Sequence, residues 1–484
     1  MAGEAITQRS GLALGRAIRA GELSSRQVVE EHIGLLRRLE PALGAIAVDR
    51  YDAALEEADA ADARIAAAAD GEELPPYLGV PCTVKESIGF EGMPNTAGVV
   101  ARRGTLAPQS APTTQRLLDL GAIPLGVTNT SELTMWIESV NRVYGRTNNA
   151  YDAGRTAGGS SGGEGAVVGS GGAPIGLGSD IGGSIRLPAF FNGVFGHKCT
   201  AHLVPNSGQW PEAIGEPTRM LAVGPIVRRA EDLMPVLSAI AGPDGTDPDT
   251  REVALGDPAD VELSGLPVII GQDITPPKIA RELLDVRERA AGALAAAGAS
   301  VRTESLKSIR RAMEYYLATL ASGEVEEVWI QVGGTPGTRA PLRRIIGDAV
   351  RGRGDHTVAL AILLAVERMG DRIPDKRNAK AVEAGRALAR EVEDTIGDGV
   401  LLHPPFGRVA PKHGRTVGKP WVILPAAIFN LMGLPATEIP LGLNPEGLPL
   451  GVQAVAGRDR DHVSIAVALE LERVFGGWVP PHPA

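Results

Sequence analysis

Glycine and serine crowd into one stretch of this chain, residues 156–188, which reads TAGGSSGGEGAVVGSGGAPIGLGSDIGGSIRLP. The whole chain holds 61 glycines in 484 residues, well above average usage and without a collagen-like period. Glycine adopts backbone conformations with φ > 0 that other residues avoid, so such a run favours tight turns. The stretch therefore predicts a site that is shaped by the backbone itself.

Strand and helix patterns alternate along much of the chain. Residues 80–84 form a short apolar, β-branched run bounded by Gly and Pro, which predicts a strand that leads directly into Lys85. Residues 113–120 are expected to form a helix that ends near Gly121, and a buried strand follows at 122–127. The other predicted strands are 174–178, 267–270, 300–303, 399–402 and 451–455, and the other predicted helices are 10–66, 279–297 and 463–475. This alternation predicts an α/β sandwich with a mostly parallel or mixed sheet.

The segment from about 305 to 395 differs from the rest, because it is rich in charged residues and in helical patterns. Such an insertion suits a lid or a substrate-side subdomain. A solvated helical cover is an equally good alternative. The sequence does not choose between the two.

Composition and charge argue against several classes of protein. The formal net charge of −10 gives no support to nucleic-acid binding, which normally requires a basic stripe. The N-terminal residues lack the apolar stretch of a secretory signal, and no window approaches about 18 uninterrupted apolar residues. Cys82 and Cys199 are too few for a disulfide framework or a zinc site. We therefore expect a cytoplasmic protein with no integral membrane segment, no metal and no bound cofactor.

Two interpretations of the glycine-rich stretch fit poorly. A phosphate-binding loop needs G-x-x-x-x-G-K-[ST], or G-x-G-x-x-G after a strand, whereas here no Lys follows and a polar loop at 148–152 precedes. Residues 158–162, GGSSG, do match G-x-S-x-G, the nucleophile elbow of an α/β-hydrolase-type esterase with Ser160 as nucleophile. An elbow must follow a buried strand and needs a histidine base. No strand pattern precedes Ser160, and the eight histidines are scattered.

A third interpretation uses both serine clusters. A short apolar strand at 174–178 runs into a turn in which two glycines precede Ser184. Consecutive glycines let successive N–H groups point toward one place, which is the arrangement that an oxyanion hole requires. Ser184 is then the nucleophile, and Ser160 relays its proton to a base. With no convincing histidine, the candidate base is Lys85, because burial lowers a lysine pKa by up to about 3–5 units.

Several motifs of the chain resemble those of the amidase signature family. GGSSGG begins at residue 158, and its first serine lies 24 positions (184 − 160) before the serine of GGSIR. Residues 79–86 are similar to the strand that carries the family's lysine. FNLMGLPA at 429–436 and GLPLGVQ at 447–453 match the family pattern further along. The resemblance spans roughly residues 10–480.

This resemblance implies a single domain over residues 1–484, folded as a three-layer α/β/α sandwich with a central mixed sheet and a Ser–Ser–Lys triad. It also implies that the bridging serine follows a cis peptide, here Gly159–Ser160. The implied triad is Ser184 as acyl nucleophile, Ser160 as bridging serine and Lys85 as general base. The implied oxyanion hole consists of the main-chain N–H groups of Ile181, Gly182, Gly183 and Ser184, and the implied supporting shell of Ser161, Ser179, Asp180 and Arg186.

The chain departs from the family pattern at a few positions. Ser179 stands where threonine is frequent, Glu86 where aspartate is frequent, and HKCT at 197–200 where Lys-Pro-Thr is common. We expect none of these residues to touch the triad, so they bear on the substrate rather than on the reaction. Glu164, the Asp-Ile pair at 180–181 and the GWVPP ending at 477–481 resemble the fatty-acid amide hydrolase branch.

Some of these residues also have purely structural interpretations. Ser160 could cap a helix that begins one or two residues later. Arg186 suits a structural ion pair as well as a site. The run His-Pro-Pro-Phe at 403–406 suits a structural loop better than a pocket wall.

The site residues and the resemblance predict hydrolysis of a linear carboxamide to a carboxylate and an amine or ammonia through a serine acyl-enzyme. Because Lys85 has to be neutral, we expect activity to rise from about pH 6 toward about 8–9. Two alternatives keep the fold, namely the amidase (glutaminase) subunit of a tRNA-dependent amidotransferase and an inactive binding scaffold. The acyl group stays open, as does the cleavage of esters, and a homodimer is the default expectation.

Overall fold

One large sheet organises the molecule. The computed structural model describes residues 5–272, 278–323, 326–334, 338–370 and 374–481. Within these ranges, 11 strands form a sheet in the order β1-β3-β2-β6-β8-β7-β12-β13-β11-β9-β10. They are β1 (Ile46–Asp49), β2 (Pro81–Lys85), β3 (Ile123–Thr128), β6 (Ile175–Asp180), β7 (Phe195–Lys198), β8 (Ala222–Val227), β9 (Pro267–Gly271), β10 (Ser300–Glu304), β11 (Val400–His403), β12 (Ala436–Leu443) and β13 (Pro449–Ala456). The short strands β4 (Val140–Asn141) and β5 (Gly145–Arg146) pair separately.

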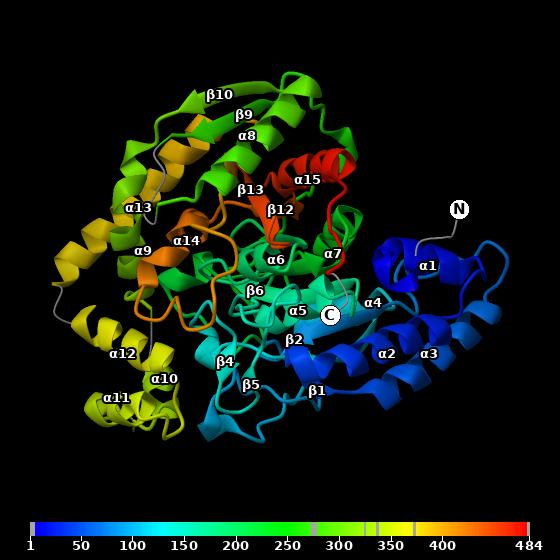
Figure 1. Cartoon of the computed structure of the whole chain (residues 1–484), viewed down its shortest axis with the longest axis horizontal. Helices are drawn as coiled ribbons and strands as arrows, with labels where there is room; N and C mark the ends of the chain where they lie inside the picture. The colour runs from blue at the N-terminus through cyan, green and yellow to red at the C-terminus, as the bar shows by residue number, and fades with distance from the viewer. Residues whose placement is uncertain (1–4, 273–277, 324–325, 335–337, 371–373, 482–484) are drawn as a thin grey trace.

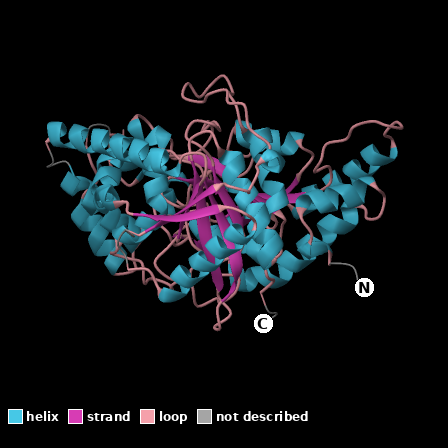
Figure 2. Cartoon of the chain, turned by 90° about the horizontal axis from the view of Figure 1, so that it is seen from above, coloured by secondary structure: helices cyan, strands magenta, loops and turns pink. Residues whose placement is uncertain are grey.

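The sheet is mixed, as the sequence predicts. Strand β2 is parallel to both β3 and β6, and β9 is parallel to both β10 and β11. The strands between these two groups pair antiparallel, from β6 with β8 to β13 with β11. Figure 2 shows the strands at the centre of the molecule with helices on both sides, which is the three-layer α/β/α arrangement.

Helices cover the two faces of the sheet (Figure 1). They are α1 (Gly11–Arg19), α2 (Ser25–Leu43), α3 (Tyr51–Ala66), α4 (Pro112–Asp119), α5 (Gly162–Gly169), α6 (Arg186–Phe191), α7 (Leu233–Ile240), α8 (Arg281–Ala296), α9 (Ala312–Leu320), α10 (Glu326–Gln331), α11 (Leu342–Val350), α12 (Val358–Gly370), α13 (Asp375–Ile396), α14 (Leu424–Met432) and α15 (Asp461–Phe475). Local capping supports the N-terminus of α2, where the Ser24 hydroxyl accepts the Gln27 N–H at 3.0 Å.

Strand β12 shows how the sheet separates its two faces. Successive side chains of a strand point to opposite sides. The Thr437 hydroxyl meets the Ser464 hydroxyl of α15 at 2.8 Å. The next residue, Glu438, is paired across the sheet with Gln453, whose side chain accepts a hydrogen bond from Arg186 at the start of α6. Helices α15 and α6 therefore lie on opposite faces of β12 and β13.

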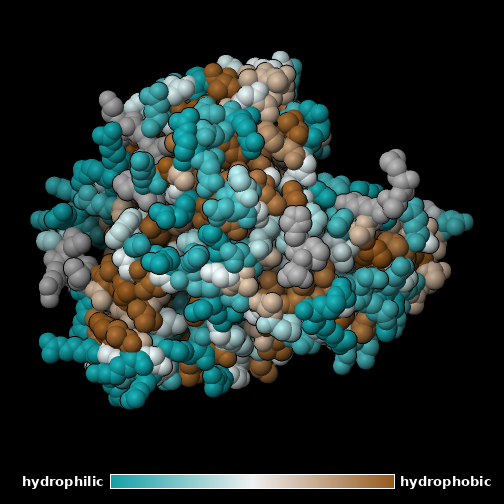
Figure 3. Space-filling view, in the orientation of Figure 1, coloured by the Kyte–Doolittle hydropathy of each residue, from teal (hydrophilic) through white to brown (hydrophobic). Residues whose placement is uncertain are grey.

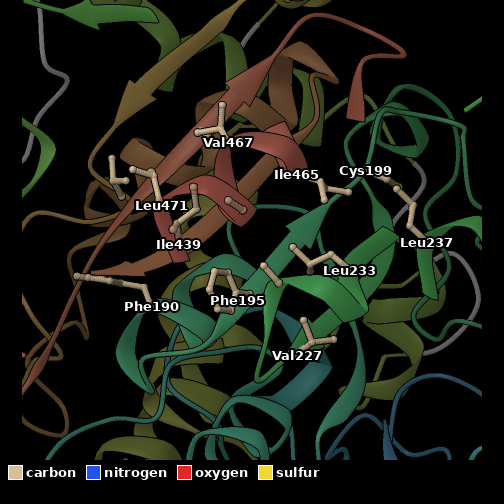
Figure 4. Packing of buried hydrophobic residues seen from close by; sticks show 14 of the residues in the cluster. Phe190, Phe195, Cys199, Val227, Leu233, Leu237, Ile439, Ile465, Val467 and Leu471 are labelled. Carbon is tan, nitrogen blue, oxygen red and sulfur yellow. The ribbon is translucent and has the colours of Figure 1, made fainter. Parts of the chain in front are cut away.

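The core around these strands is aliphatic, with few aromatic rings. Figure 4 shows buried side chains from α6, β7, α7, β12 and α15 packed together, including Phe190, Phe195, Leu233, Ile439 and Ile465. Aromatic residues make up only 4% of the chain, so Ala, Val, Leu and Ile fill most of the interior. Burial of this apolar surface is the main term that holds the layers together.

The prediction that residues 10–66 are helical is wrong between α2 and α3, where a strand intervenes. Helix α2 ends at Leu43, and Gly44 follows it in the left-handed conformation at φ 57°. Residues 46–49 then form β1, which pairs antiparallel with β3. This strand has only four residues and its second half is exposed, so it lacks the alternating pattern by which a strand is recognised in a sequence.

The helix-rich segment predicted at about 305–395 is helical, with α9 to α13 in the ranges that the structure describes. Apolar residues of α10, α11 and α12, including Trp329, Ile345 and Leu360, form a separate cluster with Ala97 and Leu133 of the preceding loops. Figure 3 shows apolar atoms at the lower left, where Figure 1 places these helices. The segment thus packs against loops near β2 and β3 rather than standing away from the domain.

Across the described ranges, none of the helices combines enough length with enough apolar character to cross a bilayer.

Candidate active site

Lys85 ends β2, the strand that lies between β3 and β6 in the parallel part of the sheet. Its side chain is fully buried. The amine Nζ lies 2.7 Å from the hydroxyl of Ser160 and 3.0 Å from the hydroxyl of Ser179. The predicted lysine thus contacts Ser160 of the first glycine-rich turn and Ser179 of strand β6. The expectation that Ser179 does not touch the triad is therefore wrong.

Ser160 lies in a loop just before α5. The peptide bond Gly159–Ser160 is cis, as the resemblance implies. The carbonyl oxygen of Ser160 accepts hydrogen bonds from the hydroxyls of Thr130, at 2.9 Å, and Ser139, at 3.0 Å. These contacts hold the backbone of Ser160 while its hydroxyl contacts Lys85.

Two alternatives for Ser160 fail on this geometry. The N-cap of α5 is Ser161, which makes no side-chain capping bond, and the Ser160 hydroxyl contacts Lys85 instead. No strand leads into Ser160, since residues 147–159, all of them described, contain none. A nucleophile elbow requires that strand, so an α/β-hydrolase-type esterase is the wrong architecture for this chain.

Ser184 lies in the turn that follows β6. Its backbone carbonyl accepts the N–H of Ser161 at 3.3 Å, so the two serine motifs are adjacent in space. The turn needs glycine at position 183, where φ is +111° and an added Cβ would lie 2.8 Å from the Cβ of Ala426. Ser184 keeps 7% of its surface exposed, whereas Lys85 keeps none. Ser184 is thus buried but keeps a small exposed surface, whereas Lys85 is completely enclosed.

Asp180 holds this turn in shape. Its carboxylate accepts the N–H of Gly183 at 2.6 Å and the N–H of Ile185 at 3.1 Å. The buried guanidinium of Arg186 donates to the same carboxylate at 3.1 Å. Burial disfavours the charge of Asp180, yet Arg186 holds the pKa of that carboxyl well below its usual value. Both charges are therefore retained inside the protein, where each compensates the other.

Arg186 also connects the Ser184 turn to distant parts of the chain. It donates to the side chains of Asn430, at 2.6 Å, and Gln453, at 2.8 Å. Asn430 in turn donates to both the carboxylate and the backbone carbonyl of Asp180. Of the two interpretations left open for Arg186, the structure places it in an ion pair that supports the site turn.

The predicted oxyanion donors differ in how they are engaged. The N–H of Gly183 is already bonded to Asp180. The N–H groups of Ile181, Gly182 and Ser184 make no hydrogen bond with the residues that the structure describes. Three of the four predicted donors therefore have no partner among the described residues.

Ser161 and Ser179 join the two turns. The Ser161 hydroxyl donates to the Ser179 carbonyl at 3.2 Å and accepts the Ser179 N–H at 3.3 Å. Since the Ser179 hydroxyl also contacts Lys85, every residue of the predicted supporting shell lies in one connected network with the lysine and the two turns.

The comparison with known families decides what this site belongs to. The sequence profile of the Amidase family matches residues 27–464. The chain belongs to the amidase family. It is a hydrolase that acts on amide C–N bonds.

Known relatives of this amidase cover nearly its whole length. Fatty-acid amide hydrolase 2-B of Danio rerio is 42% identical over 98% of this chain and 90% of the relative. Human fatty-acid amide hydrolase 2 is 38% identical over 99% of this chain and 91% of the relative. A solved structure of 6-aminohexanoate cyclic dimer hydrolase superposes with a TM-score of 0.81 at 23% identity and covers 99% of both chains. At this identity the likeness is one of fold alone.

The electrostatics of the amidase site centre on the lysine. Burial lowers the pKa of Lys85 to about 7, although the carboxylates of Asp180, Glu164 and Glu86 act in the opposite direction. An amine with that pKa exists in both charge states near neutral pH. Lys85 can therefore accept and return a proton, which an exposed lysine does poorly at that pH.

Some members of this site had no role assigned from the sequence. Asn430 and Gln453 lie inside the motifs at 429–436 and 447–453, so the motifs themselves were the available signal. Glu164 of α5 accepts hydrogen bonds from Thr83, at 2.5 Å, and Thr128, at 2.7 Å, beneath Lys85. Burial raises the pKa of Glu164 to about 7, although the two hydrogen bonds act to lower it.

Other singled-out residues lie away from the site chemistry. His403 is buried, with Nδ1 2.7 Å from the carbonyl of Pro404, as expected for a structural loop. Cys82 and Cys199 are buried, and burial raises the pKa of both thiols. Within the described ranges, no group of His, Cys, Asp and Glu side chains is arranged to hold a metal ion.

Proposed function

We propose that this enzyme hydrolyses linear carboxamides through an acyl-enzyme on Ser184, with Ser160 as proton relay and Lys85 as general base. The observation that carries the proposal is the 2.7 Å contact between a fully buried lysine amine and the Ser160 hydroxyl. The adjacent turn presents Ser184 beside three free N–H groups, which is the arrangement that stabilises an acyl-transfer transition state.

The proposed reaction has two halves. Neutral Lys85 accepts the proton of the Ser184 hydroxyl through Ser160 as the Ser184 oxygen attacks the amide carbon. The carbonyl oxygen of the amide becomes negative in this step. The proton then passes to the leaving nitrogen as the C–N bond breaks, which releases an amine and leaves an ester on Ser184. Water attacks that ester by the same route and releases the carboxylate.

The pH profile of kcat/KM reports on the proposed base. Because Lys85 acts only when neutral and its pKa is about 7, we expect kcat/KM to fall about tenfold per pH unit below about 7. Above about pH 8 the profile should become level. Initial rates with one amide substrate from pH 5 to 9.5 measure this, and a profile that is flat or that rises toward acid would contradict lysine as the base.

We further propose that the acyl group is a long aliphatic chain. Two relatives that cover this chain almost fully act, by name, on fatty-acid amides. An apolar side chain also lies beside the Ser184 turn, since Ile423 Cδ1 is 3.6 Å from where a Cβ on Gly182 would sit, and Ile181 and Ile423 are only partly buried. Such side chains suit a hydrocarbon and offer little to a charged acyl group.

An acyl-chain series tests this substrate class. Each methylene buried in an apolar pocket contributes about 0.8 kcal/mol, so each two-carbon extension should raise kcat/KM about 15-fold until the pocket is filled. p-Nitroanilides of acids with 2 to 16 carbons give the rates directly. A maximum at acetyl would contradict the long aliphatic acyl group. Ammonia release from glutamine that exceeds hydrolysis of every acyl anilide would favour the amidotransferase-type alternative, a class in which the chain also has a relative at 30% identity.

A further inference from the structure

Tyr316 is a tyrosine of the helical segment that reaches the site turn. It lies on α9, and its side chain is 3% exposed. Its hydroxyl donates a hydrogen bond of 3.1 Å to the backbone carbonyl of Ile181, directly before the glycine pair that precedes Ser184. In the fold and the reaction described above, this contact has no assigned role.

The peptide unit that accepts the hydrogen bond from Tyr316 also carries an unpaired N–H group. The carbonyl of Ile181 and the N–H of Gly182 belong to the same peptide, which is not among the cis bonds of the described chain. In a trans peptide the C=O and the N–H point in opposite directions. A donor that anchors the carbonyl of Ile181 therefore aims the N–H of Gly182 away from Tyr316, and it also polarises the amide so that this N–H becomes a better donor.

Packing at Gly182 makes the contact specific. A Cβ on Gly182 would lie 2.6 Å from the Tyr316 hydroxyl oxygen. Glycine at this position thus lets the tyrosine reach the backbone. Burial, followed by the charge of Asp180, raises the pKa of Tyr316 above its usual value, so the hydroxyl keeps its proton and remains a donor.

We propose that Tyr316 is a positioning residue that orients the Gly182 N–H as an oxyanion donor and so connects α9 to the catalytic turn. The inference rests on the function proposed above. Tyr316 does not touch the substrate in this scheme, because it acts through one peptide unit.

The test compares two single-hydroxyl deletions on the same helix. Tyr316→Phe removes the donor to Ile181, and Tyr315→Phe removes a hydroxyl one position earlier, from a similarly buried ring that stacks beneath Arg311. We expect Tyr316→Phe to lower kcat about tenfold while KM stays within about twofold, because an interaction made only in the transition state is weakened. Tyr315→Phe should leave both constants within about twofold.

A second measurement separates this role from simple packing. A trifluoromethyl ketone with the preferred acyl chain forms a tetrahedral adduct whose oxyanion occupies the hole. Its affinity should fall in Tyr316→Phe by the same factor as kcat/KM, with the melting temperatures of the two variants alike. Equal ketone affinity in the two variants would overturn the inference. A wild-type enzyme that does not bind the ketone at all would instead count against the proposed function.

Discussion

Replacing Ser184 by alanine is expected to abolish turnover and labelling by a fluorophosphonate probe. The probe forms a covalent bond only with an activated serine oxygen, and the Ser184 hydroxyl beside the three free N–H groups is the proposed one. Loss of a catalytic nucleophile costs about 10⁴–10⁶ in kcat. In-gel fluorescence of the labelled protein and initial rates on an acyl anilide measure the two effects.

The control variants separate the nucleophile from other buried serines. Ser160→Ala should slow labelling without abolishing it, since it removes the relay and leaves the nucleophile in place. Ser170→Ala changes a buried serine at the end of α5 whose hydroxyl only donates to the carbonyl of Val167, and it should label normally. Undiminished labelling of Ser184→Ala would show that another residue is the nucleophile.

Replacing Lys85 by methionine is expected to reduce kcat by about 10⁴ or more while the protein remains folded. Methionine fills much of the volume of the lysine stem but cannot accept a proton. Lys85→Arg is the matched control, because it keeps a positive charge that cannot be given up below about pH 12. Both variants should be inactive if the group acts as a base. An active Lys85→Arg enzyme would show that the charge alone is required.

The same substitution has a predictable effect on stability. The pKa of Lys85 is about 7 in the folded protein, against an ordinary value of 10.5. Between these values the unfolded chain binds more protons than the folded one, so the wild type gains stability as pH rises through this window. Lys85→Met has no amine to deprotonate on folding, so it does not lose stability at low pH in this way. Its melting temperature should exceed that of wild type most at pH 7 and below, and the difference should shrink toward pH 10.

Local motifs predicted the residues that the structure brings together at the candidate site. The glycine-serine runs, the strand before Lys85 and the turn before Ser184 are short segments whose conformation depends on their own residues. Glycine at 183 is an example, because its positive φ excludes most other residues at that position regardless of the rest of the fold. The strand order and the pairing of β7, β8 and β12 were not predictable in this way, since they depend on partners far along the chain.

The class of fold, the two serine turns and the candidate base could all be predicted from residue patterns. Three features became evident from the packed chain alone, namely the full burial of Lys85 with its contacts to Ser160 and Ser179, the hydrogen bond from the Gly183 N–H to Asp180, and the hydrogen bond from Tyr316 to Ile181. Burial and contacts across hundreds of residues arise from how layers pack, and neither leaves a local pattern in the sequence. The lowered pKa on which the proposed mechanism depends is a property of that packing, because desolvation exists only once the surrounding chain has closed over the amine.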